Sequence, residues 1–149
     1  MINISIAQVG DIEAINALLQ ENNLPFSDTR ESKIDFLIAR NSGELVGCIG
    51  METFGADGLL RSFAVKESFR NQALGKELYL HLLKYATDTN VETLHLLTNT
   101  AKDYFLRKAF VVADRKSAPG SVQQSREFSS LCPASSTYMV LEKIATYVQ

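Results

Sequence analysis

The sequence has few of the residues that metal sites, disulfide scaffolds and nucleic-acid binders need. It contains two cysteines, Cys48 and Cys132, which stand far apart and outside any CxxC or Cys/His pattern. This excludes a disulfide scaffold, predicts no zinc or other metal site, and is typical of the reducing cytoplasm. Fifteen Lys and Arg against seventeen Asp and Glu leave a formal charge of −2, which excludes a protein that binds nucleic acid through bulk phosphate attraction.

Long apolar runs are also missing. No stretch approaches the ~20 apolar residues of a membrane span, and the first residues lack the basic, apolar and small-residue pattern of a secretory leader. We therefore expect a protein that is neither exported nor embedded in a membrane. With 46% hydrophobic and 21% charged residues, the chain is typical of a single domain over 1–149.

Hydrophobic periodicity predicts a chain that mixes strands and helices. Apolar alternation and β-rich runs predict strands over 2–8, 34–40, 45–53, 59–66, 91–98, 110–114 and 137–143. Apolar residues three or four positions apart predict helices over 11–22, 75–87, 100–109 and, as an insert, 119–128. Asp11 is expected to cap the first helix, and Thr100 to form a capping box with Asp103.

The order of these elements predicts an α/β fold with a mixed sheet of six to seven strands, flanked by helices. Two turn-rich segments, 41–44 and 55–58, connect three consecutive strands, which therefore form an antiparallel meander. The last of these strands, the helix after it and strand 91–98 form a right-handed βαβ unit, because no hairpin turn separates them. The strands around Phe63 and Leu96 should then run parallel.

The polar loop between strand 59–66 and the following helix predicts an anion site. Loop amides and the free N–H groups of a helix's first turn converge at such a junction, with the positive end of the helix dipole behind them. A pyrophosphate can be held there largely by main-chain groups. Arg70 and Lys76 add positive charge at the same place.

Within this loop, Arg70-Asn71-Gln72-Ala73-Leu74-Gly75 resembles the Arg/Gln-x-x-Gly-x-Gly/Ala motif with which the GNAT-type N-acetyltransferase superfamily binds acetyl-coenzyme A. The segment Asn99…Phe105…Phe110 is similar to that family's Asn…Tyr…Gly-Phe run, with Ala109 in place of the glycine. Ala73 also replaces a glycine. We expect Ala73 early in the helix, where its methyl group is tolerated because only the amide needs to face the phosphate.

The resemblance implies a GNAT-like fold with acetyl-coenzyme A as co-substrate and no metal. It implies that the strand end 63–65 pairs its main chain with the pantetheine arm, while the loop after it holds the pyrophosphate. The implied cofactor-binding residues are Phe63, Ala64, Val65, Arg70, Asn71, Gln72, Ala73, Leu74, Gly75, Lys76, Asn99 and Phe105.

Three segments, 59–65, 96–101 and 127–134, resemble the branch of this superfamily associated with arsenic resistance, which is related to enzymes that acetylate arsinothricin- and phosphinothricin-like amino acids. The resemblance implies direct acetyl transfer to a small-molecule amine, with an amino-acid-like toxin as one acceptor class. No nucleic-acid or membrane partner is implied, and a homodimer stays open. A non-catalytic acyl-coenzyme A sensor or interaction module, and a protein N-acetyltransferase, are alternatives. Segments 23–33 and 116–134, expected as a lid, favour a small acceptor.

Direct transfer needs a base for the amine, and two glutamates are candidates. Glu52 lies on a central strand, one strand away from Arg61, where it could face the cleft. Glu127 lies beside the distinctive segment 128–133. Each of the two can equally be a surface residue. Arg61 interrupts an apolar strand and needs an anionic partner, which is either Glu52 or the carboxylate of an acceptor.

Four further residues carry an expectation for or against a role in the site. Cys132 either packs or lines the acceptor pocket. Phe105 stands where many relatives have the tyrosine that protonates the leaving thiolate, and the adjacent Tyr104 is expected to belong to the core, so that water supplies this proton. His95 is expected to point away from the cleft.

Overall fold

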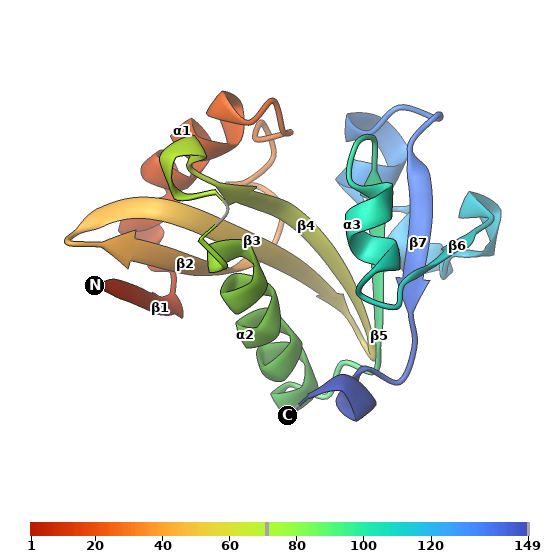
Figure 1. Ribbon diagram of the computed structural model, residues 1–149. Coiled ribbons are helices and arrows are strands. Elements are labelled where there is room, and N and C mark those ends of the chain that lie inside the picture. The colour runs from red at the N-terminus through yellow and green to blue at the C-terminus, as the bar shows by residue number, and fades with distance from the viewer. Residues whose placement is uncertain (71, 149) are drawn as a thin grey trace.

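The computed structural model describes residues 1–70 and 72–148, which form a seven-stranded mixed sheet flanked by helices (Figure 1). The strand order is β1-β2-β3-β4-β5-β7-β6, and neighbours are antiparallel except for the parallel pair β4 and β5. The predicted α/β fold, with its meander and its parallel βαβ unit, is confirmed. The strands are β1 (Ile2–Ile6), β2 (Asp35–Asn41), β3 (Glu44–Phe54), β4 (Asp57–Val65), β5 (Thr93–Thr98), β6 (Val111–Ala113) and β7 (Thr137–Leu141).

Two long helices and several short ones cover the sheet. The insert predicted as one helix over 119–128 is instead a short helix followed by a π-helical turn. Ser125 separates the two, because its hydroxyl donates to the Val122 carbonyl at 2.7 Å and accepts from the Phe128 N–H at 3.3 Å. None of the helices in the described ranges has both the length and the hydropathy to cross a bilayer. The helices are α1 (Ile12–Glu21), α2 (Leu74–Asp88), α3 (Lys102–Leu106) and α4 (Gly120–Gln123), and the single turns are η1 (Val9–Asp11), η2 (Glu67–Phe69), η3 (Arg115–Ser117), η4 (Glu127–Leu131) and η5 (Ile144–Tyr147).

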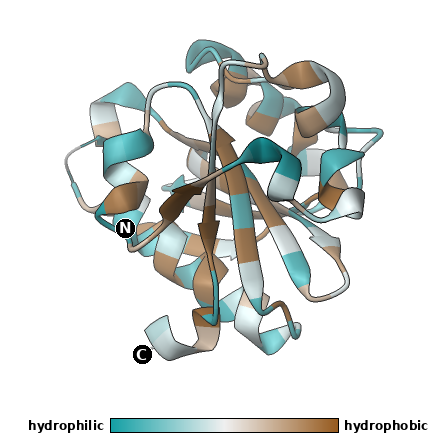
Figure 2. Cartoon of the chain, turned by 90° about the vertical axis from the view of Figure 1, so that its right-hand side faces the viewer, coloured by the Kyte–Doolittle hydropathy of each residue, from teal (hydrophilic) through white to brown (hydrophobic). Residues whose placement is uncertain are grey.

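The alternation of side chains along β2 and β3 places α1 and α2 on opposite faces of the sheet. Phe36 and Ile38 pack with the buried side of α1, whereas Leu37 and Ala39 pack with that of α2. Figure 2 shows the resulting pattern, with hydrophobic residues along the central strands and mixed colours on the helices. The buried residues of α2 are Leu74, Leu78, Tyr79, Leu82, Leu83 and Ala86.

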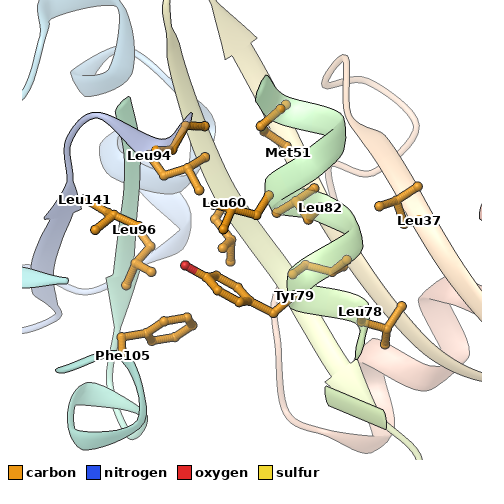
Figure 3. Packing of buried hydrophobic residues seen from close by; sticks show 14 of the residues in the cluster. Leu37, Met51, Leu60, Leu78, Tyr79, Leu82, Leu94, Leu96, Phe105 and Leu141 are labelled. Atoms are coloured by element: carbon orange, nitrogen blue, oxygen red, sulfur yellow. The ribbon is translucent and has the colours of Figure 1, made fainter. Parts of the chain in front are cut away.

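Helix α2 also spans the region where the two halves of the sheet separate. Figure 3 shows Leu78 on the side of β2 and β3, while Tyr79 points toward Leu96 and Phe105. One apolar cluster therefore holds both halves of the sheet against the same helix. Burial of this kind stabilises a protein by about 25 cal/mol for each Å² of apolar surface removed from water.

Strands β4 and β5 pair over three residues and then diverge (Figure 1). The pairing runs only from Asp57–Leu59 to Thr93–His95. The strands are parallel as predicted, but at Phe63 and Leu96 they are no longer paired, which differs from a continuous parallel ladder. A β-bulge accounts for the difference: Cys48 pairs with Ala64 but Gly50 with Arg61, and Ser62 between them has φ 55°. Such a bulge bends the strand that contains it, here away from β5.

Asp11 is the N-cap residue of α1 as predicted, but the other predicted cap, at Thr100, is wrong. The carboxylate of Asp11 makes no cap bond to α1; it accepts from the Gln8 N–H at 2.7 Å and pairs with Arg40. Helix α3 begins two residues after Thr100, so the predicted capping box does not form. On β1, Ile4 packs against the apolar cluster that includes α2, whereas Ile2 and Ile6 on the same side are 40% and 55% exposed.

Replacing Ala109 by glycine should raise the free energy of unfolding by about 0.5–1 kcal/mol. Ala109 follows α3 on the surface with φ 74°, a conformation that glycine adopts without the steric cost of a Cβ atom. Urea unfolding of the Ala109→Gly variant measures the change. The control is Ala101→Gly, which should not stabilise because Ala101 has φ −111°. Equal effects of the two substitutions would contradict the assignment of strain to position 109.

Candidate functional site

The divergence of β4 and β5 opens a cleft of about 1190 Å³. This exceeds the ~300–1,000 Å³ of most small-molecule sites, so two ligands can share it. The cleft brings together many of the residues predicted from the sequence, although these come from distant parts of the chain. The predicted residues on its walls are Arg61, Phe63, Ala64, Val65, Arg70, Gly75, Asn99, Phe105, Glu127 and Cys132.

Five predicted residues lie elsewhere. Glu52 does not line the cleft, and neither do Gln72, Ala73, Leu74 and Lys76. Ala73, Leu74 and Lys76 border a second, smaller pocket of about 270 Å³, which Arg70 and Gly75 share with the cleft. The amide of Gln72 donates to the Ser68 carbonyl at 3.3 Å. Asn71 lies outside the described residues.

The end of β4 offers an unpaired main-chain edge to the cleft. Beyond Leu59, β4 has no ladder to β5, although Phe63, Ala64 and Val65 continue the strand. An extended ligand with amide groups can bind such an edge as an added strand would. Asn99 marks the opposite wall, where its side-chain oxygen accepts from the Ser136 hydroxyl at 2.7 Å.

The start of α2 is arranged to receive an anion. Arg70 is held by the Val65 carbonyl at 3.3 Å and by the Asn22 side chain at 2.5 Å. Gly75 lies close to Phe63 and Tyr104, whose nearest atoms would be 3.7 and 3.8 Å from an added Cβ, so that the helix start approaches the cleft closely. The fifteen-residue helix supplies free N–H groups and its dipole at this point.

Lys108 is a cation of this region that the sequence analysis missed. It borders the smaller pocket together with Lys76, and its ammonium lies 5.2 Å from the ring centre of Tyr104. Burial lowers its pKa, and the neighbouring charges of Lys76 and Arg107 lower it further. An anion bound here would relieve the repulsion among these cations.

Ala73 is not part of the helix, contrary to the prediction. It precedes α2 as the N-cap residue with φ 62° and ψ 9°, which is the left-handed conformation. This explains why glycine suits the position in the motif, and alanine costs roughly 1 kcal/mol there. The sequence alone did not distinguish this position from the first turn of the helix.

At the other end of the cleft, Arg61 is buried in an acidic cluster. Its side chain is 0% exposed, and its Nη atoms donate to Asp28 at 2.6 and 2.7 Å and to Glu52 at 3.0 Å. Its Nε donates to the Ser62 hydroxyl at 3.1 Å. Asp28 was missed, because one aspartate in the polar segment 23–33 carries no signal of a distant partner.

The charges of this cluster support one another. Burial alone would raise the pKa of Asp28, but its bonds to Arg61 and Ser32 outweigh burial and hold the pKa below its usual value. Burial alone would lower the pKa of Arg61, but Asp28, Glu127 and Glu52 raise it above its usual value. Arg61 and Asp28 are therefore a fixed ion pair at neutral pH.

Glu127 completes the cluster from η4 and lines the cleft. Its side chain is 7% exposed. Oε1 lies 4.0 Å from Arg61 Nε, and Oε2 has no hydrogen-bond partner in the described part of the chain. Burial raises the pKa of Glu127 to about 7, with Glu52 and Asp28 adding to the rise and Arg61 opposing it. A carboxyl group with such a pKa can exchange protons at neutral pH.

Tyr104, expected in the core, instead borders both pockets. Phe105 is the buried member of the pair and packs against Phe110, with ring centres 5.3 Å apart. Burial raises the pKa of Tyr104, so that its phenol stays protonated and can donate a proton. Burial also raises the pKa of the Cys132 thiol to about 12, which makes Cys132 a neutral part of the wall.

His95 lies on the other side of β5 from the cleft. Its ring nitrogens contact the Tyr138 hydroxyl at 2.6 Å and the Asp57 carboxylate at 2.8 Å. The segments expected as a lid both reach the cleft, through Phe26 and Leu131 among others, and an ion pair of 2.7 Å between Arg126 and Glu31 connects them. Within residues 1–70 and 72–148, no group of three or more His, Cys, Asp or Glu could hold a metal ion.

Comparison with known proteins identifies the family and the fold. The model of the acetyltransferase (GNAT) family matches residues 9–110. The N-acetylglutamate synthase of Neisseria gonorrhoeae, solved with coenzyme A and N-acetyl-glutamate, is 23% identical with a TM-score of 0.80; the match covers 96% of this chain and 35% of the synthase. The chain thus spans about a third of that protein's length.

Two other solved structures match over nearly their full length. The ribosomal-protein-S18-alanine N-acetyltransferase of Escherichia coli is 18% identical, with a TM-score of 0.74 and coverage of 96% of this chain and 94% of that one. The PaiA N-acetyltransferase of Thermoplasma acidophilum, solved with coenzyme A, is 17% identical, with a TM-score of 0.70 and coverage of 95% and 99%. At these identities the likeness shows the shared fold.

Removing Arg61 should be far more damaging than removing an exposed arginine of an ion pair. Arg61→Met leaves three buried carboxyl groups without their cation and should lower the free energy of unfolding by about 3–5 kcal/mol. Arg126→Met, which breaks the exposed pair with Glu31, should cost less than about 1 kcal/mol. Urea unfolding of both variants measures this, and similar losses would show that Arg61 does not hold the cluster together.

The raised pKa of Glu127 should appear in the pH dependence of stability. The folded protein keeps a proton that the unfolded chain releases between about pH 4.5 and pH 7, so the free energy of unfolding falls as the pH rises through this window. Glu127→Gln lacks this titrating group and does not show this loss. Its free energy of unfolding, taken relative to that of the wild type, should therefore rise by about 2 kcal/mol from pH 5 to pH 8. Urea titrations at both pH values measure the difference. Glu13→Gln, at an exposed site on α1, is the control, and equal curves for the two variants would contradict the assignment.

Proposed function

Because the chain belongs to the acetyltransferase (GNAT) family, we propose that it transfers the acetyl group of acetyl-coenzyme A directly to the amine of a small molecule. One observation carries this proposal: a single cleft joins an anion-binding helix start and an unpaired strand edge to a buried glutamate with a near-neutral pKa. These are the parts that acetyl transfer from a thioester to an amine requires. We take the 149 residues to be one acetyltransferase domain.

The cofactor end would rely mainly on the main chain. The N–H groups of Phe63 to Val65 would pair with the pantetheine arm and polarise the thioester carbonyl. The start of α2, Arg70 and Lys76 would hold the pyrophosphate, and Lys108 would contribute to the same charge. Because backbone N–H groups do this work, Ala73 and the other loop residues tolerate side-chain changes that leave the backbone in place.

At the acceptor end, Glu127 is the base that the geometry favours over Glu52. Glu52 accepts a hydrogen bond from Arg61 through its Oε2 and does not line the cleft, so it acts as a positioning residue. Glu127 would take a proton from the acceptor's ammonium, directly or through a water. The neutral nitrogen then attacks the carbonyl carbon, and the carbon–sulfur bond breaks as the thiolate of coenzyme A leaves. The nitrogen gives up its second proton in the same step, and this proton replaces the one that the thiolate takes from its donor.

The leaving thiolate needs a proton, and Tyr104 is in place to supply it. Its phenol borders the cleft and stays protonated at neutral pH. Tyr104 thereby takes the role that Phe105 cannot perform, with water as the alternative donor. The products are the N-acetylated amine, free coenzyme A and one proton returned to solvent.

The acceptor class is the finer part of the proposal. The lid segments around Phe26 and Leu131 enclose the acceptor end, which favours a small molecule over a protein chain. The resemblance of segments 59–65, 96–101 and 127–134 supports testing arsinothricin- and phosphinothricin-type toxins, and with them a role in arsenic resistance. The two unpaired cysteines support a cytoplasmic site of action.

A non-catalytic acyl-coenzyme A sensor is the second candidate. The left-handed Ala73 favours it, because strain in the cofactor loop would disturb a catalytic geometry more than simple binding. Thiol release from acetyl-coenzyme A with a panel of small amines, beside calorimetric titration of the cofactor, separates the two functions. Tight binding without thiol release for any amine would favour the sensor, and absence of binding would refute the acetyltransferase proposal.

The base is tested by a pH profile of kcat/KM. The wild type should gain activity as the pH rises through about 7, because Glu127 must be ionised to accept a proton. Glu127→Gln should lose about 10²–10⁴-fold in kcat together with this rise. Glu13→Gln serves again as the control and should keep both. A Glu127→Gln enzyme with an unchanged rate and profile would show that another group, or water alone, is the base.

A further inference from the structure

The acceptor end of the cleft holds more negative than positive charge. Arg61 is the one cation of the cluster, and three carboxyl groups surround it, from Asp28, Glu52 and Glu127. One negative charge is left unmatched when Glu127 is protonated, and two when it is ionised. An unmatched charge in a buried site is costly, so the cluster favours a ligand that brings a positive group.

Arg61 is not free to bind the carboxylate of an acceptor. Four of its N–H contacts are used, two to Asp28, one to Glu52 and one to Ser62, and its side chain is fully buried. A third carboxylate would have one remaining N–H to bind, and a bidentate contact would have to displace Asp28 or Glu52 from this guanidinium. It would also add negative charge to a cluster that already has too much.

No other cation in the described wall of the cleft can take that carboxylate. Arg70 is the remaining one, and it lies at the cofactor loop, where the Asn22 side chain and the Val65 carbonyl hold it. The rest of the described wall holds neutral polar residues and apolar groups such as Leu131 and Pro133. An α-carboxylate placed beside the reacting amine would therefore lose its water without gaining a charged partner.

Glu127 provides an acceptor for the ammonium group of a ligand. Its Oε2 is buried and has no hydrogen-bond partner in the described residues, although the side chain lines the cleft. Buried carboxylate oxygens normally accept hydrogen bonds, so this atom points to a donor that a ligand supplies. An ammonium group has three N–H donors and a positive charge, and it meets both needs at once.

We propose that the acceptor is a primary amine with an apolar body and no carboxylate beside the amino group, held by its ammonium at Glu127. This inference rests on the proposed acetyl transfer and narrows its acceptor class. It stands against α-amino acids whose carboxylate stays charged, and therefore against the arsinothricin- and phosphinothricin-type acceptors that the sequence resemblance supports, so the two acceptor classes give opposite results in the assay below. It also makes Arg61 a positioning residue for the acidic cluster. The excess charge of the cleft thus selects the acceptor.

The test compares acceptors that differ only at the carboxylate. L-Phenylalanine is measured against L-phenylalanine amide and 2-phenylethylamine, and L-methionine against its amide and its decarboxylated amine. Thiol release gives kcat/KM, and calorimetry with the protein saturated with coenzyme A gives Kd without requiring turnover. The amides and amines should exceed the amino acids at least tenfold in kcat/KM and bind at least tenfold more tightly.

The variant Glu127→Gln should remove the preference in Kd, whereas Glu13→Gln should retain it. Amino acids that bind or react as well as their amides would overturn the inference, as would a failure of every compound to bind. If the amines bind selectively but no thiol is released, the inference stands and the proposed acetyl transfer fails. The two ideas are therefore judged by separate readouts.

Discussion

The burial of Arg61 is the constraint on which the acceptor half of the molecule depends. Its guanidinium joins the loop that contains Asp28, strand β3 through Glu52, and strand β4 itself, with Glu127 of η4 close by. A cation without exposure to water persists only if every partner is held in position. The same contacts that keep Arg61 satisfied therefore hold two distant segments of the chain over one wall of the cleft.

Much of the fold could be predicted because its signals are local. Alternating apolar residues and turn-rich connections predict the meander, and a row of leucines predicts α2. What could not be predicted depends on contacts far apart in sequence. The partner of Arg61 includes Asp28, thirty-three positions away, and the orientation of Tyr104 follows from how α3 packs on Phe63. The divergence of the strands follows from a bulge at Ser62 that has no glycine to reveal it.

The candidate site also has one part that local sequence patterns predict and one part that they do not. The proposed cofactor end could be predicted from a motif, because a strand, a loop and a helix start that act through their main chain leave a clear pattern. The acceptor end depends on side chains from an irregular insert, in which Ser125 interrupts a helix and η4 follows. Glu52 and Glu127 looked alike in sequence, and both are buried. What separates them is that Glu52 accepts a hydrogen bond from Arg61, whereas Glu127 lines the cleft and its Oε2 has no partner in the described residues.

The short pairing between β4 and β5 also has a consequence for how the sequence of such a protein can change. Only three residue pairs join the two parts of the sheet, and the described main-chain contacts of β1 to β4 are complete without the insert. Substitutions at the exposed positions of residues 119–134 can change one wall of the cleft without touching the ladders of β1 to β4, whereas Val122 and Phe128 are tied to Leu59 of β4 in a buried cluster. A lineage with this architecture would therefore vary its proposed acceptor wall first at the exposed positions of this insert.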